Sequence, residues 1–134
     1  MQRESVVHFF IQAAKNNNFG AKVYEWLARP VEASELPVVI VKDEEDRIDG
    51  SLSDVSAHRL RVTIEVIWGN GDKTAKELRA MMQEILHRIK EQEERFMGYL
   101  AFVGASLEVD QHEFIVGSGV IEIDAVYNTA KWEL

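Results

Sequence analysis

Few segments of this 134-residue sequence carry residue types that could do chemistry, and the one nearest to a nucleotide motif runs from Gly69 to Thr74. It lies between a predicted strand and a predicted helix, where phosphate-binding loops occur. Such a loop needs Gly-x-x-x-x-Gly-Lys-Ser/Thr, because several successive amides must wrap the phosphates before the lysine reaches them. Here Asp72 separates Gly71 from Lys73, the loop is too short, and the carboxylate would repel a phosphate. We interpret the segment as a turn that leads into a helix cap.

The segment Gly117-Ser118-Gly119 offers a hydroxyl that could act as a nucleophile. A nucleophile elbow needs Gly-x-Ser-x-Gly at a strand-to-helix turn, with an acid and a base following in the chain. After Ser118 a strand is predicted, and no histidine follows it. A bulge or a hairpin turn is therefore the better interpretation.

Histidine, a common metal ligand and general base, occurs at His8, His58, His87 and His112. No two of these have the spacing of a ligand pair on one helix, and the sequence lacks a His-Glu-x-x-His motif. A metal site at a strand end is conceivable from Asp110, His112 and Glu113, but we prefer an ordinary polar turn there. No catalytic residue, metal site or cofactor is predicted, and we do not expect an enzyme.

Carboxylates are densest in residues 43–56, a polar segment with Asp49-Gly50-Ser51 as a turn signal. We predict a long hairpin loop here. Paired carboxylates do acid–base chemistry only where their surroundings separate their pKa values, and a solvated loop does not do this. The loop is expected either to be solvated or to contact a partner. The candidate residues for a contact with another protein subunit are Asp43, Glu44, Glu45, Asp46, Arg47 and Asp49.

Hydrophobic periodicity predicts two helices, over residues 5–15 and 74–96, and a capping box of Thr74 and Glu77 starts the second. Strands are predicted over residues 23–27, 38–41, 59–68, 100–110 and 116–130. The alternation in two strands places on one inward face Leu60, Val62, Ile64, Val66, Ile121 and Ile123. The fold class is α+β, with one mostly antiparallel or mixed sheet of four to five strands packed with two helices. Residues 1–134 form a single domain.

Three tryptophans, Trp26, Trp68 and Trp132, lie at or near the ends of predicted elements. Large aromatic side chains in such places serve equally as edges of a core or as anchors of an interface. The sequence leaves both roles open for each of them.

Composition narrows the classes of partner. With 15 Lys and Arg against 23 Asp and Glu, the formal net charge is −8. Binding a duplex through its phosphates needs a basic surface, so sequence-specific nucleic-acid binding and anionic membranes are disfavoured. The absence of cysteine excludes disulfides and a thiol nucleophile. We see neither a signal peptide nor an apolar run of about 20 residues, so the protein is expected in the cytoplasm.

The order of elements and several short patches resemble the tail terminator family of phages with long non-contractile tails, typified by the lambda minor tail protein U. Gly20-Ala21 follows the first helix, Arg29-Pro30 comes next, and Leu36-Pro37 opens a strand. The acidic segment, the alternating strand and one long helix follow in the family's order. The chain then finishes Lys131-Trp132-Glu133-Leu134, similar to an aromatic–Glu–aliphatic ending. The resemblance covers nearly the whole length.

The resemblance implies a structural virion protein rather than a catalyst. Members of the family form a hexameric ring at the head-proximal end of the tail, which caps the tail tube and stops its polymerisation. The implied partners are further copies of the chain, the tail tube protein and a head-completion protein. A net charge of −8 also suits a ring through which DNA passes, because an acidic lumen repels phosphate.

Two other functions compete with this interpretation. The first is a head–tail joining or tail-completion protein of similar size, which would bind at the neck of the virion. The second is a small-molecule-binding or enzymatic α+β domain, which would use a pocket between the sheet and the helices. The second predicts a convergent group of polar residues facing inward, whereas the inward positions assigned above are apolar.

Overall fold

The computed structural model describes residues 1–111 and 115–134. Two α-helices and five strands make up the described fold: α1 (Arg3–Lys15), β1 (Lys22–Glu25), β2 (Val38–Ser51), β3 (Val55–Trp68), α2 (Thr74–Gln92), β4 (Tyr99–Gln111) and β5 (Ile115–Ala130). Short 3-10 turns occupy Ala33–Glu35, Gly71–Lys73 and Glu93–Arg95. The predicted α+β class, with one mixed and mostly antiparallel sheet and two helices, is confirmed.

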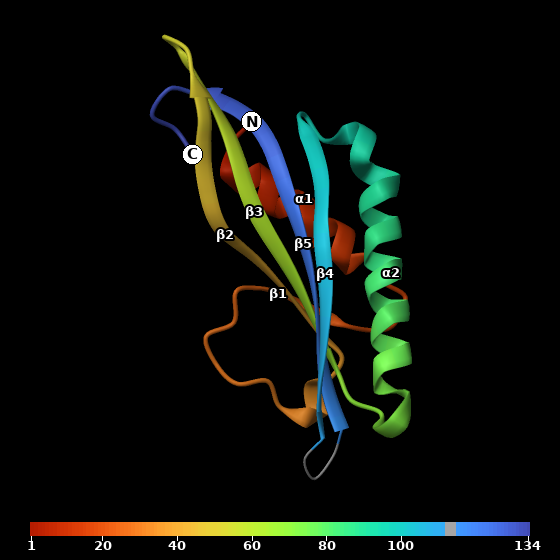
Figure 1. The fold of residues 1–134 in the computed structure, drawn as a ribbon. Coiled ribbons are helices and arrows are strands. Elements are labelled where there is room, and N and C mark those ends of the chain that lie inside the picture. The colour runs from red at the N-terminus through yellow and green to blue at the C-terminus, as the bar shows by residue number, and fades with distance from the viewer. Residues whose placement is uncertain (112–114) are drawn as a thin grey trace.

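The strands lie in the order β1-β2-β3-β5-β4 (Figure 1). β1 pairs with β2 in parallel, and every other neighbouring pair is antiparallel. Four residues of β1 pair with only the first four of β2, from Val38 to Val41. The rest of β2 and the whole of β4 therefore form the outer edges of the described sheet.

Both helices pack against one face of the sheet. Alternate residues of β3 and β5 point to that face. All six positions that the sequence predicts as inward-facing, four in β3 and two in β5, are buried. From the helices, Val6 and Phe10 of α1 and Leu78 and Ile85 of α2 join the same core cluster. The opposite face, which we call the open face, has no helix over it in the described part of the chain.

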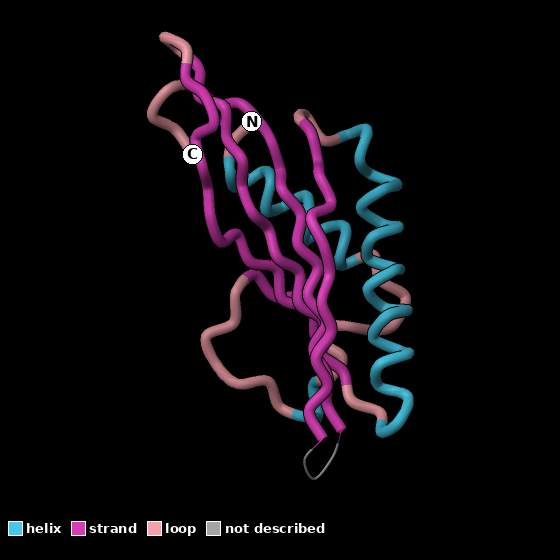
Figure 2. The backbone as a smooth tube through the Cα atoms, in the orientation of Figure 1, coloured by secondary structure: helices cyan, strands magenta, loops and turns pink. Residues whose placement is uncertain are grey.

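The prediction of a long acidic loop over residues 43–56 is wrong. Residues 43–51 continue β2, paired with β3 from Asp43↔Val62 to Ser51↔Ser56, and only residues 52–54 form the turn. Figure 2 shows strand backbone running almost to the tip of this hairpin. Asp and Glu are poor strand formers, which favoured a loop. Cross-strand cations and ladder hydrogen bonds override that preference here, and bulges between Asp43 and Glu45 and between Ile48 and Gly50 adjust the register.

The start of α2 also differs from the prediction, because no capping box forms between Thr74 and Glu77. The Thr74 hydroxyl instead donates to the Gly71 carbonyl (2.8 Å) and accepts from the Asn70 N–H (2.8 Å). Glu77 accepts a hydrogen bond from the Asn70 side chain. The 3-10 turn Gly71–Lys73 leads directly into α2, whose N-cap is Lys73, so the helix start is stabilised from the preceding turn.

Candidate functional site

The six charged residues predicted as an interface are divided between the two sides of β2. Asp43 and Asp46 lie on the helix-covered side, where Arg3 and His58 contact them. Asp49 pairs with Arg59 on the open face. Glu45 and Arg47 line a shallow hollow on the open face, and Glu44 accepts a hydrogen bond from the Thr63 hydroxyl (3.3 Å). The predicted group is therefore not one surface.

On the helix-covered side, side chains from four elements form what we call the buried polar cluster: Arg3, Asp43, Asp46, His58, Tyr127 and Thr129. Arg3 Nε lies 2.6 Å from Asp43 Oδ2, and Trp26 Nε1 donates to Asp43 Oδ1 (2.9 Å). His58 Nδ1 lies 2.9 Å from Asp46 Oδ2, and its ring stacks on Tyr127 with centroids 4.9 Å apart. The cluster fixes the first turn of α1 to the far half of the β2–β3 hairpin.

Asp46, His58 and Thr129 form a carboxylate–imidazole–hydroxyl chain, an order used in nucleophilic catalysis. His58 Nε2 is 2.7 Å from Thr129 Oγ1, and Nδ1 must carry a proton to bond to Asp46. The Thr129 hydroxyl is also 2.9 Å from the Ala130 carbonyl, and both His58 and Thr129 are buried. Because backbone carbonyls accept hydrogen bonds from the Thr129 hydroxyl, this hydroxyl is not free to act as a nucleophile. The three side chains instead hold β2, β3 and β5 together.

Two polar atoms of the buried polar cluster have no hydrogen-bond partner among the described residues: Asp46 Oδ1 and the Tyr127 hydroxyl. Burial, and then the negative charge of Asp46, raise the pKa of Tyr127 to about 12. For Asp43, burial pushes the pKa up, but hydrogen bonds from Trp26 and Arg3 outweigh it and hold the pKa below its ordinary value. The cluster is thus ionised at Asp43 and neutral at Tyr127.

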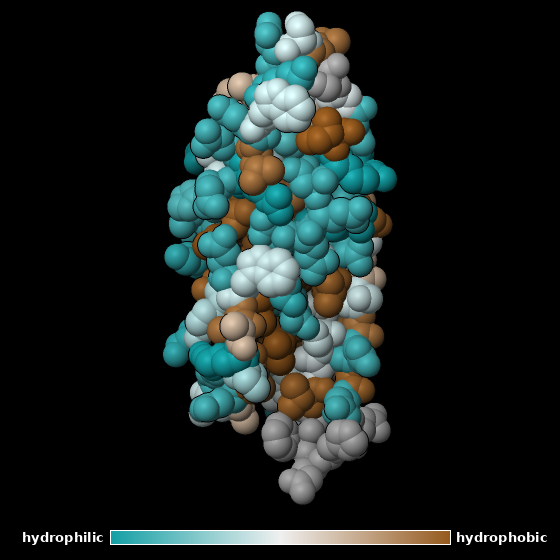
Figure 3. Space-filling model, turned by 90° about the vertical axis from the view of Figure 1, so that its left-hand side faces the viewer, coloured by the Kyte–Doolittle hydropathy of each residue, from teal (hydrophilic) through white to brown (hydrophobic). Residues whose placement is uncertain are grey.

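The open face carries a ladder of ion pairs across β2, β3 and β5. Arg61 Nε lies 2.6 Å from Asp124 Oδ1, and Arg61 Nη1 lies 2.8 Å from Glu122 Oε2. Arg59 reaches both Asp49 (2.9 Å) and Asp124 (3.4 Å). The hydrogen bond from Arg61 outweighs burial and lowers the pKa of Asp124. Figure 3 shows a broad band of hydrophilic residues on the side of the molecule away from α2.

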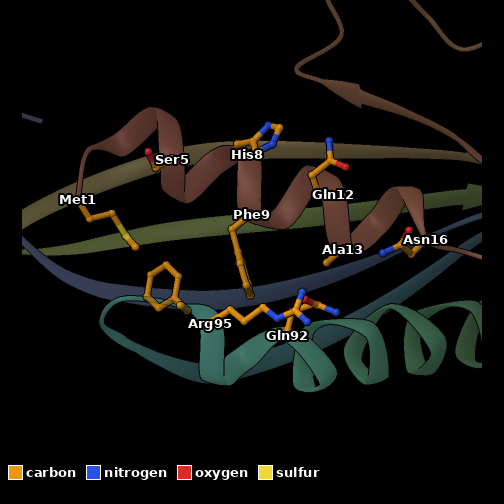
Figure 4. Close-up of a pocket in the computed structure, with 10 residues that line it drawn as sticks. Met1, Ser5, His8, Phe9, Gln12, Ala13, Asn16, Gln92 and Arg95 are labelled. Carbon is orange, nitrogen blue, oxygen red and sulfur yellow. The ribbon is translucent and has the colours of Figure 1, made fainter.

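A pocket of about 380 Å³ lies between α1 and α2 (Figure 4), and Phe9 and Phe96 are among the residues that line it. These two rings contact each other at a centroid distance of 5.3 Å. In Figure 4, Ser5, His8 and Gln12 point away from α2, whereas Arg95 lies beside Phe9. The polar groups around the pocket do not converge on one point, which a small-molecule site would require.

The motifs considered in the sequence have structural roles. Gly117-Ser118-Gly119 lies within β5, so neither a bulge nor a turn forms there. A Cβ on Gly117 would lie 2.6 Å from a Leu78 methyl, and one on Gly119 would meet Met82. The glycines therefore let α2 approach the sheet, and Ser118 donates to Glu65 (2.7 Å).

Metal binding was considered at Asp110, His112 and Glu113, and the last two lie outside the described residues. Within residues 1–111 and 115–134, no group of three His, Asp or Glu side chains could hold a metal ion. In the same residues, no helix has the length and apolar character needed to cross a membrane.

Exposed large apolar residues fall mainly into two groups. The tip surface comprises Ile48, Leu52, Val55, Trp132 and Leu134, and the β4 surface comprises Met97, Tyr99, Phe102, Val103 and Leu107. Each group lies along a rim of the sheet and includes residues of both faces: Phe102 pairs with the inward-facing Ile123, whereas Tyr99 pairs with Val126 of the open face. The Lys131 N–H donates to the Asp54 carbonyl (3.0 Å), which places the end of the chain beside the hairpin turn. The tip surface lies at the end of the β2–β3 hairpin, and the β4 surface follows the edge strand β4. Trp26, half exposed, lies apart from both.

The sequence missed the buried polar cluster and both apolar surfaces. One signal was present for the cluster: His58 continues the even-numbered series from Leu60 to Val66, so its side chain had to face inward. Nothing near His58 in the sequence identifies Asp46 or Thr129 as its partners.

No family model matches this chain, and a search of curated proteins found no match to it.

Proposed function

We propose that this protein is a structural assembly protein whose copies join head to tail into a closed ring. Following the resemblance of its sequence to tail terminators, the ring is a hexamer that caps a phage tail tube. One face of the ring binds the tail tube protein and ends polymerisation, and the other offers a surface to a head-completion protein. In this proposal the protein acts in the virion, after assembly in the host cytoplasm.

One observation carries the self-assembly: the exposed apolar residues divide into two separate surfaces, one at the tip of the β2–β3 hairpin and one along the edge strand β4. A two-fold dimer uses the same patch on both copies, whereas a head-to-tail contact needs two different patches. A repeated head-to-tail contact closes into a ring when its rotation allows. The tip surface and the β4 surface meet this requirement.

The edges of the sheet support the same arrangement. β4 is the outermost strand of the described sheet, so one row of its backbone groups faces outward over 13 residues. Long open edges with apolar side chains are strong sites for pairing with another chain. β2 beyond Val41 is the corresponding open edge on the other side, and its exposed Glu45 and Arg47 remain candidates for the ring or tube interface.

The experiment is light scattering on a size-exclusion column over a concentration series, followed by negative-stain microscopy of the heaviest fraction. We expect rings of about six subunits with a central hole, and their binding to the ends of tubes assembled from tail tube protein. A monomer or dimer at millimolar protein would contradict the proposal, because weak rings form at that concentration by mass action. Rings that leave tube growth unchanged would exclude tail termination and favour a head–tail joining protein that binds at the neck of the virion.

A matched pair of variants tests the β4 surface. Val103→Lys adds a charge to an apolar residue that is 46% exposed, and Gln12→Lys adds the same charge on the outer side of α1. We expect Val103→Lys to abolish rings at concentrations where Gln12→Lys leaves them intact. Equal assembly by both variants would remove the β4 surface from the interface.

A further inference from the structure

Trp132 is the most exposed large apolar residue in the described chain, at 89%. Its backbone has φ 71°, in the left-handed region that a bulky residue adopts only at a cost in free energy. Strained residues that persist in a fold tend to lie at functional positions, and tryptophan is prominent among residues that dominate binding interfaces. The exposure and the strain together mark Trp132 as an anchor for a partner.

The segment that carries Trp132, residues 131–134, is held in place at several points. The Glu133 N–H donates to the Ala130 carbonyl (3.2 Å), and the Arg3 N–H donates to the Leu134 carbonyl (3.0 Å). The ammonium of Lys131 lies 5.4 Å from the centre of the Trp132 ring. The indole is therefore presented from a fixed turn, and binding it costs less ordering entropy than binding a mobile tail.

A groove that suits such an anchor lies between α2 and β4. It has a volume of about 340 Å³, and its apolar lining is Leu86, Ile89, Leu100, Phe102 and Ile123. Phe102 is 58% exposed at its margin. The groove therefore combines an apolar base with an aromatic ring at its entrance, which suits a flat aromatic side chain.

The groove and Trp132 of one chain do not meet. Figure 1 places the C end of the chain beside β2, and α2 on the opposite side of the molecule. An indole that enters the groove must come from another molecule. A contact of this kind joins two different surfaces, so it repeats head to tail.

The charged residues beside the groove and those beside Trp132 are complementary. Lys90 and Glu93 are exposed on one rim of the groove, and Lys131 and Glu133 flank the anchor. None of these four side chains makes an ion pair within residues 1–111 and 115–134. With Trp132 in the groove, Glu133 can pair with Lys90, and Lys131 with Glu93. This complementarity identifies a second copy of the chain as the occupant.

We infer that Trp132 of one copy inserts into the groove between α2 and β4 of the next copy, with Glu133 against Lys90. The inference rests on the proposed self-assembly, and it names the two surfaces that meet. Phe102 forms the outer wall of the site, and the remaining apolar residues of the tip surface pack against the β4 surface around it.

Directed cross-linking tests the contact without removing the anchor, because the chain has no cysteine of its own. A Glu133→Cys protein is mixed with a Lys90→Cys protein and oxidised. We expect a disulfide-linked pair joining one of each, and no such pair when Lys76→Cys, exposed near the start of α2, replaces Lys90→Cys. Rings that assemble without the specific link would overturn the inferred contact but not the proposed ring. A specific link found only in open chains would support the contact and reject the closed ring. If neither the link nor rings form, both the contact and the ring are rejected.

The energetics of the contact have their own test. Trp132→Ala is expected to weaken self-association by about 30-fold or more, as loss of a central tryptophan anchor does. Lys90→Glu and Glu133→Lys should each weaken it by a few fold, and the double variant should recover most of the loss. Unchanged association of Trp132→Ala, or no recovery in the double variant, would count against the inference.

Discussion

The buried polar cluster and the ladder of the open face are built from the same three strands and similar side chains. On one side Asp46, His58 and Thr129 are joined within the core. On the other, the carboxylate of Asp124, itself nearly buried, is joined to Arg59 and Arg61, whose side chains are about a third exposed. His58 is 1% exposed, whereas the side chain of Arg61 is 34% exposed. The two polar networks therefore lie on opposite faces of one sheet, in very different surroundings.

The comparison shows that burial decides how much each network contributes. Losing a buried hydrogen-bonded group leaves its partners unsatisfied, and the cost is that of desolvating them. Losing a surface ion pair lets water replace the partner, so the change in stability is small. The helix-covered side is expected to set the stability of the hairpin, while the open face stays available for contacts.

The largest expected effect comes from His58→Ala. The change removes two hydrogen bonds and the stacking contact with Tyr127 and leaves a cavity. We expect the free energy of unfolding to fall by about 3 kcal/mol, measured by denaturant titration. His8→Ala, at an exposed histidine of α1, is the control and should stay within about 0.5 kcal/mol of the parent. Equal effects of the two substitutions would remove the distinction between buried and exposed positions.

Asp124→Asn should cost less, about 1 kcal/mol at neutral pH, because the asparagine keeps the shape of the buried side chain and water can solvate the partly exposed Arg59 and Arg61. The pKa of Asp124 is lowered in the folded protein, chiefly by Arg61, so its contribution is present above the ordinary pKa of 3.8. It is lost as the pH falls through the folded value. Stability curves of the two proteins should converge below about pH 4. A gap that persists in strong acid would mean that packing, not charge, accounts for the loss.

Tyr127→Phe sharpens the comparison by removing a buried hydroxyl that has no partner among the described residues. Stability at neutral pH should be unchanged or rise by up to about 1 kcal/mol. The pKa of Tyr127 is raised from 10.0 to about 12, so the parent should lose stability as the pH rises between these values. The variant should lose less over that range in denaturant titrations. A clear loss of stability at pH 7 would show that the hydroxyl is satisfied.

Asp49→Asn should have the smallest effect. The Asp49 side chain is 43% exposed and its partner Arg59 is 33% exposed, so water and Asp124 replace the lost contact. We expect no measurable shift of the unfolding midpoint and no change in its salt dependence. A shift comparable to that of His58→Ala would show that the surface ladder is as important as the buried cluster.

Most of the fold follows from local patterns. The alternation in β3 and β5 correctly assigned the buried face. Successive side chains of a strand point to opposite faces, so all the apolar residues of an alternating series lie on the same face. The second half of β2 could not be predicted, since its strand conformation depends on pairing with β3 and on Arg3, distant in sequence from Asp43. The candidate interface was for that reason assigned to a loop that does not exist.

The sequence by itself determined the α+β class, the two helices and the apolar inner face, because periodicity and composition are properties of neighbouring residues. The tertiary structure decided which charges are buried, since His58 and Thr129 are 71 residues apart in the chain. It also decided the surroundings of the tryptophans. Trp68 is partly buried against the core, whereas Trp26 and Trp132 have left-handed backbones and are 50% and 89% exposed. The exposure of a residue outside a periodic segment depends on how the whole chain packs, and the local sequence around these tryptophans does not encode it.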